Sequence, residues 1–226
     1  MEYIRLSNGI EMPLLGYGVF LVSPEECERC VTDALSVGYR LIDTAQAYQN
    51  EEGVGRAWKG SGLKREELFL TTKVWISNAG EEKAARSIDE SLRKLQTDYI
   101  DLLLIHQAYG DVFGSWRAME KAYKEGKVRA IGVSNFQSAR FFDFAHYVDV
   151  KPMINQLQCN ALIQQRGIVA IPKSSHKERM AQNFQVFDFT LTDEEMAQIA
   201  TLNQHDAGTV NFADTNFVKY LIETYG

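Results

Sequence analysis

Residues 98–135 read DYIDLLLIHQAYGDVFGSWRAMEKAYKEGKVRAIGVSN, and this stretch decides the fold class. Residues 98–106 and 128–135 contain the runs LLLI and AIGV, which are apolar without alternation, as is typical of strands buried on both faces. Between them, residues 115–126 have the spacing of a helix that Gly126 closes. A helix between two buried strands brings them into parallel pairing. The stretch therefore predicts one strand, helix and strand unit of an α/β fold.

The same alternation extends to both sides of this unit. Helical spacing recurs before and after it, over residues 24–38, 50–60, 81–96 and 138–148. There are seven strand candidates, at residues 40–45, 68–74, 98–106, 128–134, 152–156, 168–172 and 185–189. The residues between the fifth and sixth candidates are too few to hold the helix that the preceding junctions have. One strand and helix region is therefore expected to be missing from this series.

Such a series can form an open nucleotide-binding sheet or a closed (β/α)8 barrel. The open dinucleotide fold needs G-x-G-x-x-G between its first strand and the following helix. Gly16/Gly18 and Gly53/Gly55 are G-x-G pairs that lack the third glycine and do not join a strand to a helix. The sequence therefore predicts a TIM-type barrel that lacks its sixth strand and the flanking helices. We expect residues 1–226 to form this single domain, with the deletion junction near residues 165/166.

In a barrel, the chemistry lies at the carboxyl ends of the strands. Polar side chains follow the predicted strands at these ends: Asp43, Lys73, His106, Ser134, Asn135, Asn155, Gln156 and Lys173. Each one alone is most often a turn residue or a solvated side chain. A set of Asp, Lys, His and Ser-Asn on consecutive strands is an unusual coincidence for a surface without a function. We therefore expect a functional site at this rim.

The residue types at this rim favour the reduction of a carbonyl group. Asp43 and Lys73 come from adjacent strands and can form an ion pair, and Tyr48 follows Asp43 closely enough to reach the same place. A nearby ammonium is expected to lower the pKa of Tyr48 and make it a proton donor. A neutral His106 can donate a hydrogen bond that orients a carbonyl oxygen. A hydride source would complete the reaction.

Composition and charge exclude other classes of protein. The 226 residues have a net charge of −6 without a basic run, which argues against nucleic acid or an anionic membrane as a partner. No stretch is long and apolar enough to span a membrane, and no signal pattern is present, so a cytoplasmic protein is expected. Cys27 and Cys30 form C-x-x-C on the apolar face of a helix that a Ser23–Glu26 capping box starts, and we expect them in the core.

Six segments in their order and approximate spacing resemble the signatures of the aldo-keto reductase superfamily: LIDTAQAY, LTTKVW, DLLLIHQ, AIGVSNF, INQ and IPKSSHKERMAQN. The resemblance covers nearly the whole chain. It implies a catalytic tetrad of Tyr48 as the acid, Asp43 and Lys73 as residues that adjust it, and His106 as the residue that orients an aldehyde or ketone. It also implies cofactor contacts for Thr44, Ser134, Asn135 and Gln156, the last three at the nicotinamide carboxamide.

KSSHKER, residues 173–179, places cations and a hydroxyl at the start of a helix, which is typical of an anion site. By the resemblance, Lys173, Ser174 and Arg179 bind the 2′-phosphate that distinguishes NADPH from NADH, and Gln182 and Asn183 lie near the adenine. The resemblance also implies a substrate pocket. Its expected members are Phe20, Trp75, Trp116 and Gln107, the last at a position where several relatives have a bulky aromatic residue.

The missing region leaves three interpretations open. The chain can be an incomplete record of an ordinary, monomeric NADPH-dependent reductase. It can be a shortened chain that folds, with subunits that exchange elements in an oligomer and with slow turnover. It can also be a non-catalytic relative that serves as a binding or assembly module. Two other enzyme classes fit less well. The four histidines do not group as metal ligands, and a Schiff-base aldolase that uses Lys73 or Lys173 leaves Tyr48 and KSSHKER unexplained.

Overall fold

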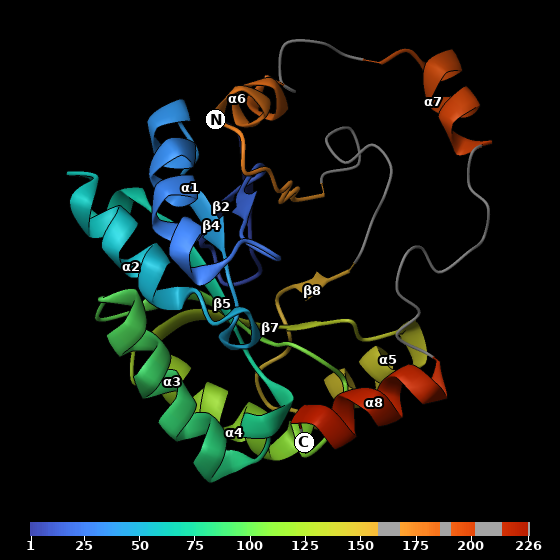
Figure 1. Cartoon of the computed structure of the whole chain (residues 1–226). Helices are drawn as coiled ribbons and strands as arrows, with labels where there is room; N and C mark the ends of the chain where they lie inside the picture. Colours follow the sequence, from blue (N-terminus) through green and yellow to red (C-terminus); the bar gives the residue numbers. More distant parts are fainter. Residues whose placement is uncertain (158–167, 186–190, 202–213, 226) are drawn as a thin grey trace.

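A parallel sheet of six strands lies at the centre of the molecule (Figure 1). The computed structural model describes residues 1–157, 168–185, 191–201 and 214–225. The strand order follows the sequence, β3-β4-β5-β6-β7-β8. The strands are β3 (Tyr17–Gly18), β4 (Leu41–Asp43), β5 (Phe69–Val74), β6 (Ile100–Ile105), β7 (Val128–Ser134) and β8 (Asn155–Gln156). The sequence predicted a TIM-type barrel that lacks one strand. Within the described residues, the structure has a parallel sheet of successive strands that does not close into a complete barrel.

Helices connect successive strands and cover the outer face of the sheet (Figure 1). These connecting helices are α1 (Pro24–Val37), α2 (Glu51–Gly60), α3 (Glu81–Leu95), α4 (Val112–Lys124) and α5 (Ser138–Tyr147). Further helices follow the last strand: α6 (Lys177–Phe184), α7 (Asp193–Ala200) and α8 (Thr215–Tyr225). Short 3₁₀ turns are η1 (Gln46–Tyr48), η2 (Arg65–Glu67) and η3 (Ile76–Asn78). None of the helices in the described ranges is long and apolar enough to cross a membrane.

Two apolar clusters, one on each side of the sheet, explain why apolar residues occupy successive positions in strands such as β6. In β6, Leu102 and Leu104 join the inner cluster, whereas Leu103 and Ile105 join the larger outer cluster beneath the helices. Successive residues of a strand point to opposite faces. Both faces of the sheet are buried, so polar residues would be costly at either position.

A short hairpin of β1 (Tyr3–Arg5) and β2 (Glu11–Pro13) closes the amino end of the strands. Leu6 and Met12 insert from it into the inner cluster. Asn8 at its turn donates from Nδ2 to the carbonyl oxygen of Arg129, near the start of β7, over 2.9 Å. The hairpin therefore fixes which end of the sheet is covered and leaves the carboxyl ends for other roles.

A buried carboxylate ties the strands together at the same amino end. Asp101 is fully buried and accepts hydrogen bonds from Arg65 Nη2 at 2.6 Å, Arg129 Nη1 at 2.7 Å and the Leu70 amide at 2.9 Å. Hydrogen bonds from two guanidinium groups and one amide replace those that the carboxylate would make with water, which offsets the cost of its burial. This cluster joins β5, β6 and β7.

The helix starts agree with the sequence in one place and differ in another. Ser23 caps α1, and its Oγ accepts from the Glu26 amide at 3.3 Å, as predicted. Helix α4 begins at Val112, earlier than expected, because Asp111 caps it through the Gly114 amide. Cys27 and Cys30 are fully buried on α1, which confirms their place in the core, and burial raises the pKa of Cys27 to about 12.

The edges of the sheet correct the strand count. Tyr17–Gly18 is a strand that the sequence did not predict, so residues 152–156 provide the sixth strand of the sheet rather than the fifth. The sequence analysis counted the missing strand as the sixth of the barrel. Because residues 152–156 are themselves the sixth strand, that position was wrong by one, and the missing strand is the seventh. Ala170 pairs in parallel with Leu15, so residues 168–172 lie beside β3 at the edge opposite β8. The predicted junction at 165/166 and residues 186–189 lie outside the described residues, and Gln185 follows α6 as its cap.

Candidate active site

A buried ion pair lies at the carboxyl ends of β4 and β5. Lys73 Nζ donates to Asp43 Oδ1 at 2.6 Å and to the Thr44 carbonyl oxygen at 2.8 Å. Gln156 Nε2, from β8 across the sheet, donates to Asp43 Oδ2 at 2.9 Å. Burial alone would lower the pKa of Lys73, but Asp43 and Tyr48 outweigh it, so the pKa is raised and Lys73 stays an ammonium.

Tyr48 lies over this ion pair, at the end of η1. The Lys73 ammonium is 5.1 Å from the centre of the Tyr48 ring, which is packed on one side by Phe20 and on another by His106. The turn ends at Gln49 with φ of 55°, a left-handed conformation that stops the helix. The sequence prediction that Tyr48 reaches the ion pair agrees with this geometry.

Two amide side chains next to Tyr48 hold its turn, and sequence reasoning missed both. Gln46 accepts from the Trp75 amide and from Asn78 Nδ2, both at 2.9 Å, and donates to Ser87 and Ser91 of α3. Their only signal in the sequence is their spacing of two residues on either side of Tyr48. Such amides could equally be solvated, so sequence alone does not assign them.

Asn50, the second of these amides, is buried. It accepts from Thr44 Oγ1 at 2.7 Å and donates to the carbonyl oxygens of Val19 and Val22 at 3.1 and 3.0 Å. The loop that carries Phe20 is thereby tied to the end of β4. Thr44 is expected to contact the cofactor, but its hydroxyl donates its hydrogen bond to Asn50 within the protein.

His106 follows β6 and faces the same place. Its ring lies 5.5 Å from the Tyr48 ring and 4.8 Å from the Trp75 ring, centre to centre. Burial, together with the Lys73 charge, lowers the pKa of His106 well below 6.5. The imidazole is therefore neutral at pH 7, as the sequence argument required, and its buried Nδ1 has no hydrogen-bond partner among the described residues.

The pKa of Tyr48 departs from the sequence expectation. Burial raises it above its ordinary value of 10.0, and the lowering by the Lys73 ammonium is smaller. The expectation of a net lowering was therefore wrong, although the direction of the Lys73 contribution was right. At pH 7 the phenol is protonated, and the Lys73 ammonium stabilises its phenolate form.

Three polar residues at the ends of β7 and β8 line the next part of the rim. Ser134 is buried, and Asn135 has a left-handed φ of 61°. Asn135 Nδ2 donates to the His106 carbonyl oxygen at 3.1 Å and to Ser134 Oγ at 3.2 Å. Gln156 donates to Asp43 as described. The structure thus brings Ser134, Asn135 and Gln156 together with the Asp43–Lys73 pair, while Asn155 turns to the Phe136 carbonyl oxygen.

The predicted anion segment is anchored to the far edge of the sheet. Tyr17 donates from its hydroxyl to the Ser174 carbonyl oxygen at 2.5 Å, and Tyr39 donates to the Met180 carbonyl oxygen at 3.1 Å. Lys173 and Arg179 are exposed, and neither makes an ion pair with a described residue. Ser174 Oγ is bonded to His176 at the start of α6. Gln182 is exposed and Asn183 partly buried on the same helix.

The four residues expected to line a substrate pocket lie in different surroundings. Phe20 is 55% exposed beside Tyr48, and Trp75 packs on His106, so both border the site. Gln107 is buried next to His106 in the chain, and its Oε1 has no hydrogen-bond partner in the part of the chain that the structure describes. Trp116 lies in the outer core on α4, against Phe144, and donates to the Val150 carbonyl oxygen. The expectation that Trp116 lines the pocket is not supported by these contacts.

The family model of the Aldo/keto reductase family matches residues 15–170 of the chain, which include the whole group around Tyr48. The chain belongs to this family. Glyoxal reductase of Bacillus subtilis is 37% identical over 259 residues, with 91% of this chain and 94% of the relative aligned. Methylglyoxal reductase DkgA of Salmonella typhimurium is 38% identical, with 89% and 93% aligned. The family predicted from the sequence is thereby confirmed.

Solved aldo-keto reductases have the same architecture as this family member. MGS-M4, from a deep-sea metagenome library, superimposes with a TM-score of 0.90 at 35% identity, over 94% of this chain and 99% of that one. The aldo-keto reductase AKR2E4 of Bombyx mori, in complex with NADP, gives 0.87 at 29% identity and covers 96% of both chains.

The alignments also measure what this aldo/keto reductase lacks. The alignment with the Bacillus subtilis relative extends over 259 positions but includes 91% of the 226 residues, so roughly fifty positions face no residue of this chain. The relatives are therefore longer by an amount that can hold a strand with its helices.

His106 should make the stability of this aldo/keto reductase depend on pH. Below pH 6.5 the unfolded chain protonates His106, whereas the folded protein, with its lowered pKa, does not. We expect the free energy of unfolding to fall as pH falls through this window, and His106→Gln to remove part of that slope. Urea unfolding of both proteins at about pH 7.5 and about pH 5.5 measures this. Identical slopes would contradict a neutral, buried His106.

Proposed function

We propose that this aldo/keto reductase transfers hydride from NADPH to the carbonyl carbon of a small aldehyde or ketone, while Tyr48 protonates the oxygen. The observation that carries the proposal is the position of Tyr48 between the Lys73 ammonium and the neutral His106 ring. A protonated phenol beside a fixed cation and an imidazole is suited to a developing alkoxide.

Each residue of the site has a separate role in the proposed reaction. His106 donates a hydrogen bond to the carbonyl oxygen and holds it near the Tyr48 hydroxyl. As negative charge grows on that oxygen, the Tyr48 proton moves to it, and the Lys73 ammonium stabilises the phenolate left behind. Asp43 keeps Lys73 in place and charged, through the bond of 2.6 Å. Gln46 and Asn50 hold the turn, so little reorganisation is needed.

The residues present fit a nicotinamide dinucleotide at both of its ends. Asn135 and Gln156 use their amide N–H groups within the protein, and no described donor bonds to Asn135 Oδ1 or Gln156 Oε1, which leaves acceptors for a carboxamide. At the other end, Lys173 and Arg179 are cations without a described acidic partner, which suits the 2′-phosphate. When bound, NADPH supplies the hydride. Thr44, Ser174, Gln182 and Asn183 are proposed as further contacts.

The substrate class follows from the borders of the site and from the relatives. Phe20 packs on Tyr48, Trp75 packs on His106, and the buried Gln107 directly follows His106 in the chain. A glutamine at position 107 offers polar groups to a substrate that has a second oxygen next to the reacting carbonyl. The relatives are named as glyoxal and methylglyoxal reductases. We therefore propose small α-dicarbonyl compounds as the first substrates to examine.

A second candidate function rests on the open sheet. Between β8 and residues 168–172 the described residues provide no strand pairing, although the family barrel is closed. The second candidate is therefore that this chain is a weakly active or non-catalytic member of the family, which binds NADPH and acts as a binding or assembly module.

One assay separates the two candidates. The purified chain is mixed with NADPH and methylglyoxal, and NADPH oxidation and the alcohol product are both measured, with NADH as a parallel cofactor. A reductase oxidises NADPH in proportion to product and prefers NADPH to NADH. Binding of NADPH without turnover would support the module, and failure to bind either cofactor would exclude both candidates.

A further inference from the structure

The segment of residues 173–185 holds the proposed phosphate contacts and continues into α6, which packs on α1 (Figure 1). It includes Lys173 and Arg179, whose side chains are proposed to bind the 2′-phosphate. Both cations are exposed, so packing of their side chains does not fix where the charges lie. The position of this phosphate site therefore depends on what holds the backbone of the segment.

Two buried tyrosines donate hydrogen bonds to this backbone. Tyr17 of β3 is 1% exposed, and its hydroxyl donates to the Ser174 carbonyl oxygen at 2.5 Å. Tyr39, just before β4, is 0% exposed, and its hydroxyl donates to the Met180 carbonyl oxygen at 3.1 Å. Each of these carbonyl groups belongs to the residue that directly follows one of the two cations. Each hydroxyl therefore holds the backbone beside one proposed phosphate contact.

The two tyrosine rings are themselves held in the core. Tyr17 and Tyr39 belong to the outer apolar cluster, and their ring centres are 5.9 Å apart. Phe184, at the end of α6, packs edge-on against Tyr39 at 5.0 Å. Gly38 leaves room for this contact, because a Cβ there would lie 3.0 Å from the Phe184 ring. The packed core thereby sets the position of the segment through both rings.

A third side chain reaches the same backbone more weakly. Arg29 of α1 donates to the Ser175 carbonyl oxygen, at 3.4 Å from Nη1 and 3.5 Å from Nη2. Its side chain is 51% exposed and also pairs with Glu26 and Asp33. Long, exposed hydrogen bonds contribute less than short, buried ones. The tyrosine hydroxyls therefore provide the stronger attachment.

Both tyrosine hydroxyls keep their protons under assay conditions. Burial raises the pKa of Tyr39 to about 12 and also raises the pKa of Tyr17. Each phenol is therefore a hydrogen-bond donor at neutral pH. A buried phenol or carbonyl group that lost its partner would pay the cost of its own desolvation.

We propose that Tyr17 and Tyr39 are positioning residues for cofactor choice, which hold Lys173 and Arg179 where the 2′-phosphate of NADPH binds. A site that is already arranged for its ligand loses less conformational freedom on binding, and its apparent affinity falls when that arrangement is less populated. The two hydroxyls act through the backbone and do not contact the cofactor. The inference rests on the proposed phosphate contacts of Lys173 and Arg179.

Titrations of the purified chain with NADPH and with NADH, followed by protein fluorescence, test the proposal. Tyr17→Phe and Tyr39→Phe each keep the ring and remove one hydroxyl. Each variant should raise the dissociation constant of NADPH about tenfold and that of NADH no more than about twofold, because NADH has no 2′-phosphate. Calorimetry with 2′,5′-ADP, which has this phosphate but no nicotinamide, should show the same loss of affinity.

Tyr123→Phe is the matched control. Tyr123 is partly buried on α4 and packs on the same outer cluster, so the variant removes a tyrosine hydroxyl away from the segment. Both dissociation constants should stay unchanged in it. Circular dichroism establishes that every variant is folded before its cofactor affinity is measured. Equal weakening of NADPH and NADH in the two test variants would overturn the proposal, because it would indicate a general loosening of the fold.

Arg179→Ala separates this inference from the proposed function. If Arg179→Ala weakens NADPH binding while Tyr17→Phe and Tyr39→Phe do not, the phosphate site stands and the positioning role is overturned. If Arg179→Ala leaves the affinity for NADPH and for 2′,5′-ADP unchanged, the phosphate contact itself is excluded, and the positioning role falls with it. Selective loss of NADPH affinity in all three variants would support both.

Discussion

Replacing Tyr48 by Phe is expected to lower kcat for aldehyde reduction by about 10³-fold and to leave the dissociation constant of NADPH nearly unchanged. A positioned proton donor contributes roughly 10²–10⁴ to a rate. The phenyl ring keeps the packing against Phe20 and His106, so the loss is confined to the hydroxyl proton. Steady-state kinetics with methylglyoxal and a fluorescence titration with NADPH measure the two quantities.

The matched control for this variant is Tyr99→Phe. Tyr99 lies against Arg65 and Arg129 at the amino end of the sheet, and its hydroxyl has no role in the proposed reaction. Activity close to that of the unchanged protein is expected. Turnover retained in Tyr48→Phe would remove Tyr48 from the role of acid, whatever the cofactor affinity.

Replacing Asp43 by Ala should lower the free energy of unfolding by about 3–5 kcal/mol, besides abolishing activity. The change leaves the Lys73 ammonium buried without its counter-ion, and the cost of an uncompensated buried charge has this size. The Lys73 side chain is 1% exposed and the Asp43 side chain 5%, so water does not replace the lost carboxylate. Urea unfolding measures the difference.

Glu11→Ala provides the comparison for this second prediction. Glu11 and Arg5 also form an ion pair, at 3.4 Å, but their side chains are 61% and 72% exposed. Such surface pairs contribute about 0–1 kcal/mol. Equal losses in the two variants would mean that the Asp43–Lys73 pair is not buried in the way the structure has it.

The strands that could be predicted from the sequence are those buried on both faces. β5, β6 and β7 lie within the predicted ranges, because apolar residues occupy successive positions in each, as in Phe69–Leu70, Leu102–Ile105 and Ala130–Val133. Tyr17–Gly18 has two residues and no periodicity, so only its partners in the fold make it a strand. The same is true of the hairpin at the amino end.

The candidate site was predictable to the extent that its residues end strands. Asp43, Lys73 and His106 follow apolar runs, and the structure places them together. The supports of Tyr48 were not predictable, because Gln46 and Asn50 act through contacts with residues distant in sequence, such as Ser91 and Val19. The pKa of Tyr48 was misjudged for a related reason, since burial is a property of the whole fold.

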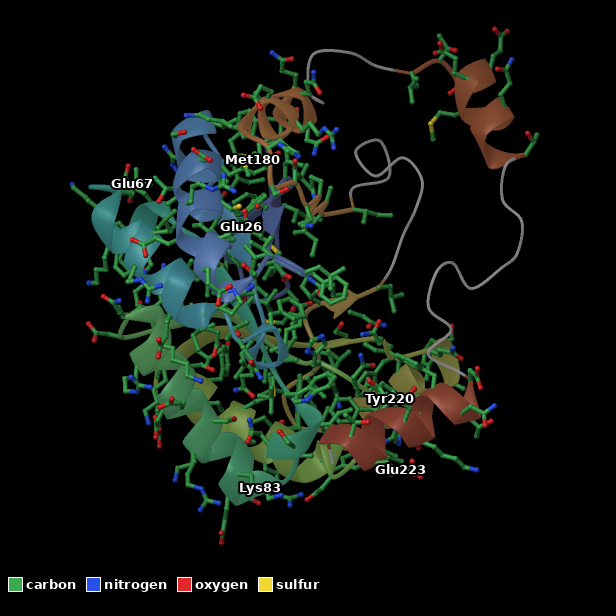
Figure 2. All side chains as sticks on the ribbon, in the orientation of Figure 1. Glu26, Glu67, Lys83, Met180, Tyr220 and Glu223 are labelled. Atoms are coloured by element: carbon green, nitrogen blue, oxygen red, sulfur yellow. The ribbon has the colours of Figure 1, made fainter. Side chains whose placement is uncertain are left out.

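Figure 2 shows side chains filling the space beneath the helices, with ionic side chains such as Lys83 and Glu67 on the outside. Each end of the strands has a buried carboxylate, Asp43 at the carboxyl end and Asp101 at the amino end. Asp101 at the amino end is bonded to two guanidinium groups and a backbone amide, at the opposite end of the strands from the Asp43–Lys73 pair.

The consequence concerns how this chain can change its specificity. Asp101 and its partners secure the strands at the end remote from Phe20, Trp75 and Gln107, the proposed neighbours of the substrate carbonyl. Substitutions at these three positions therefore alter the substrate without loosening the bonds that hold the strands together. Libraries randomised at Phe20, Trp75 and Gln107 should yield a high proportion of soluble variants, whereas libraries at Arg65 and Arg129 should yield few.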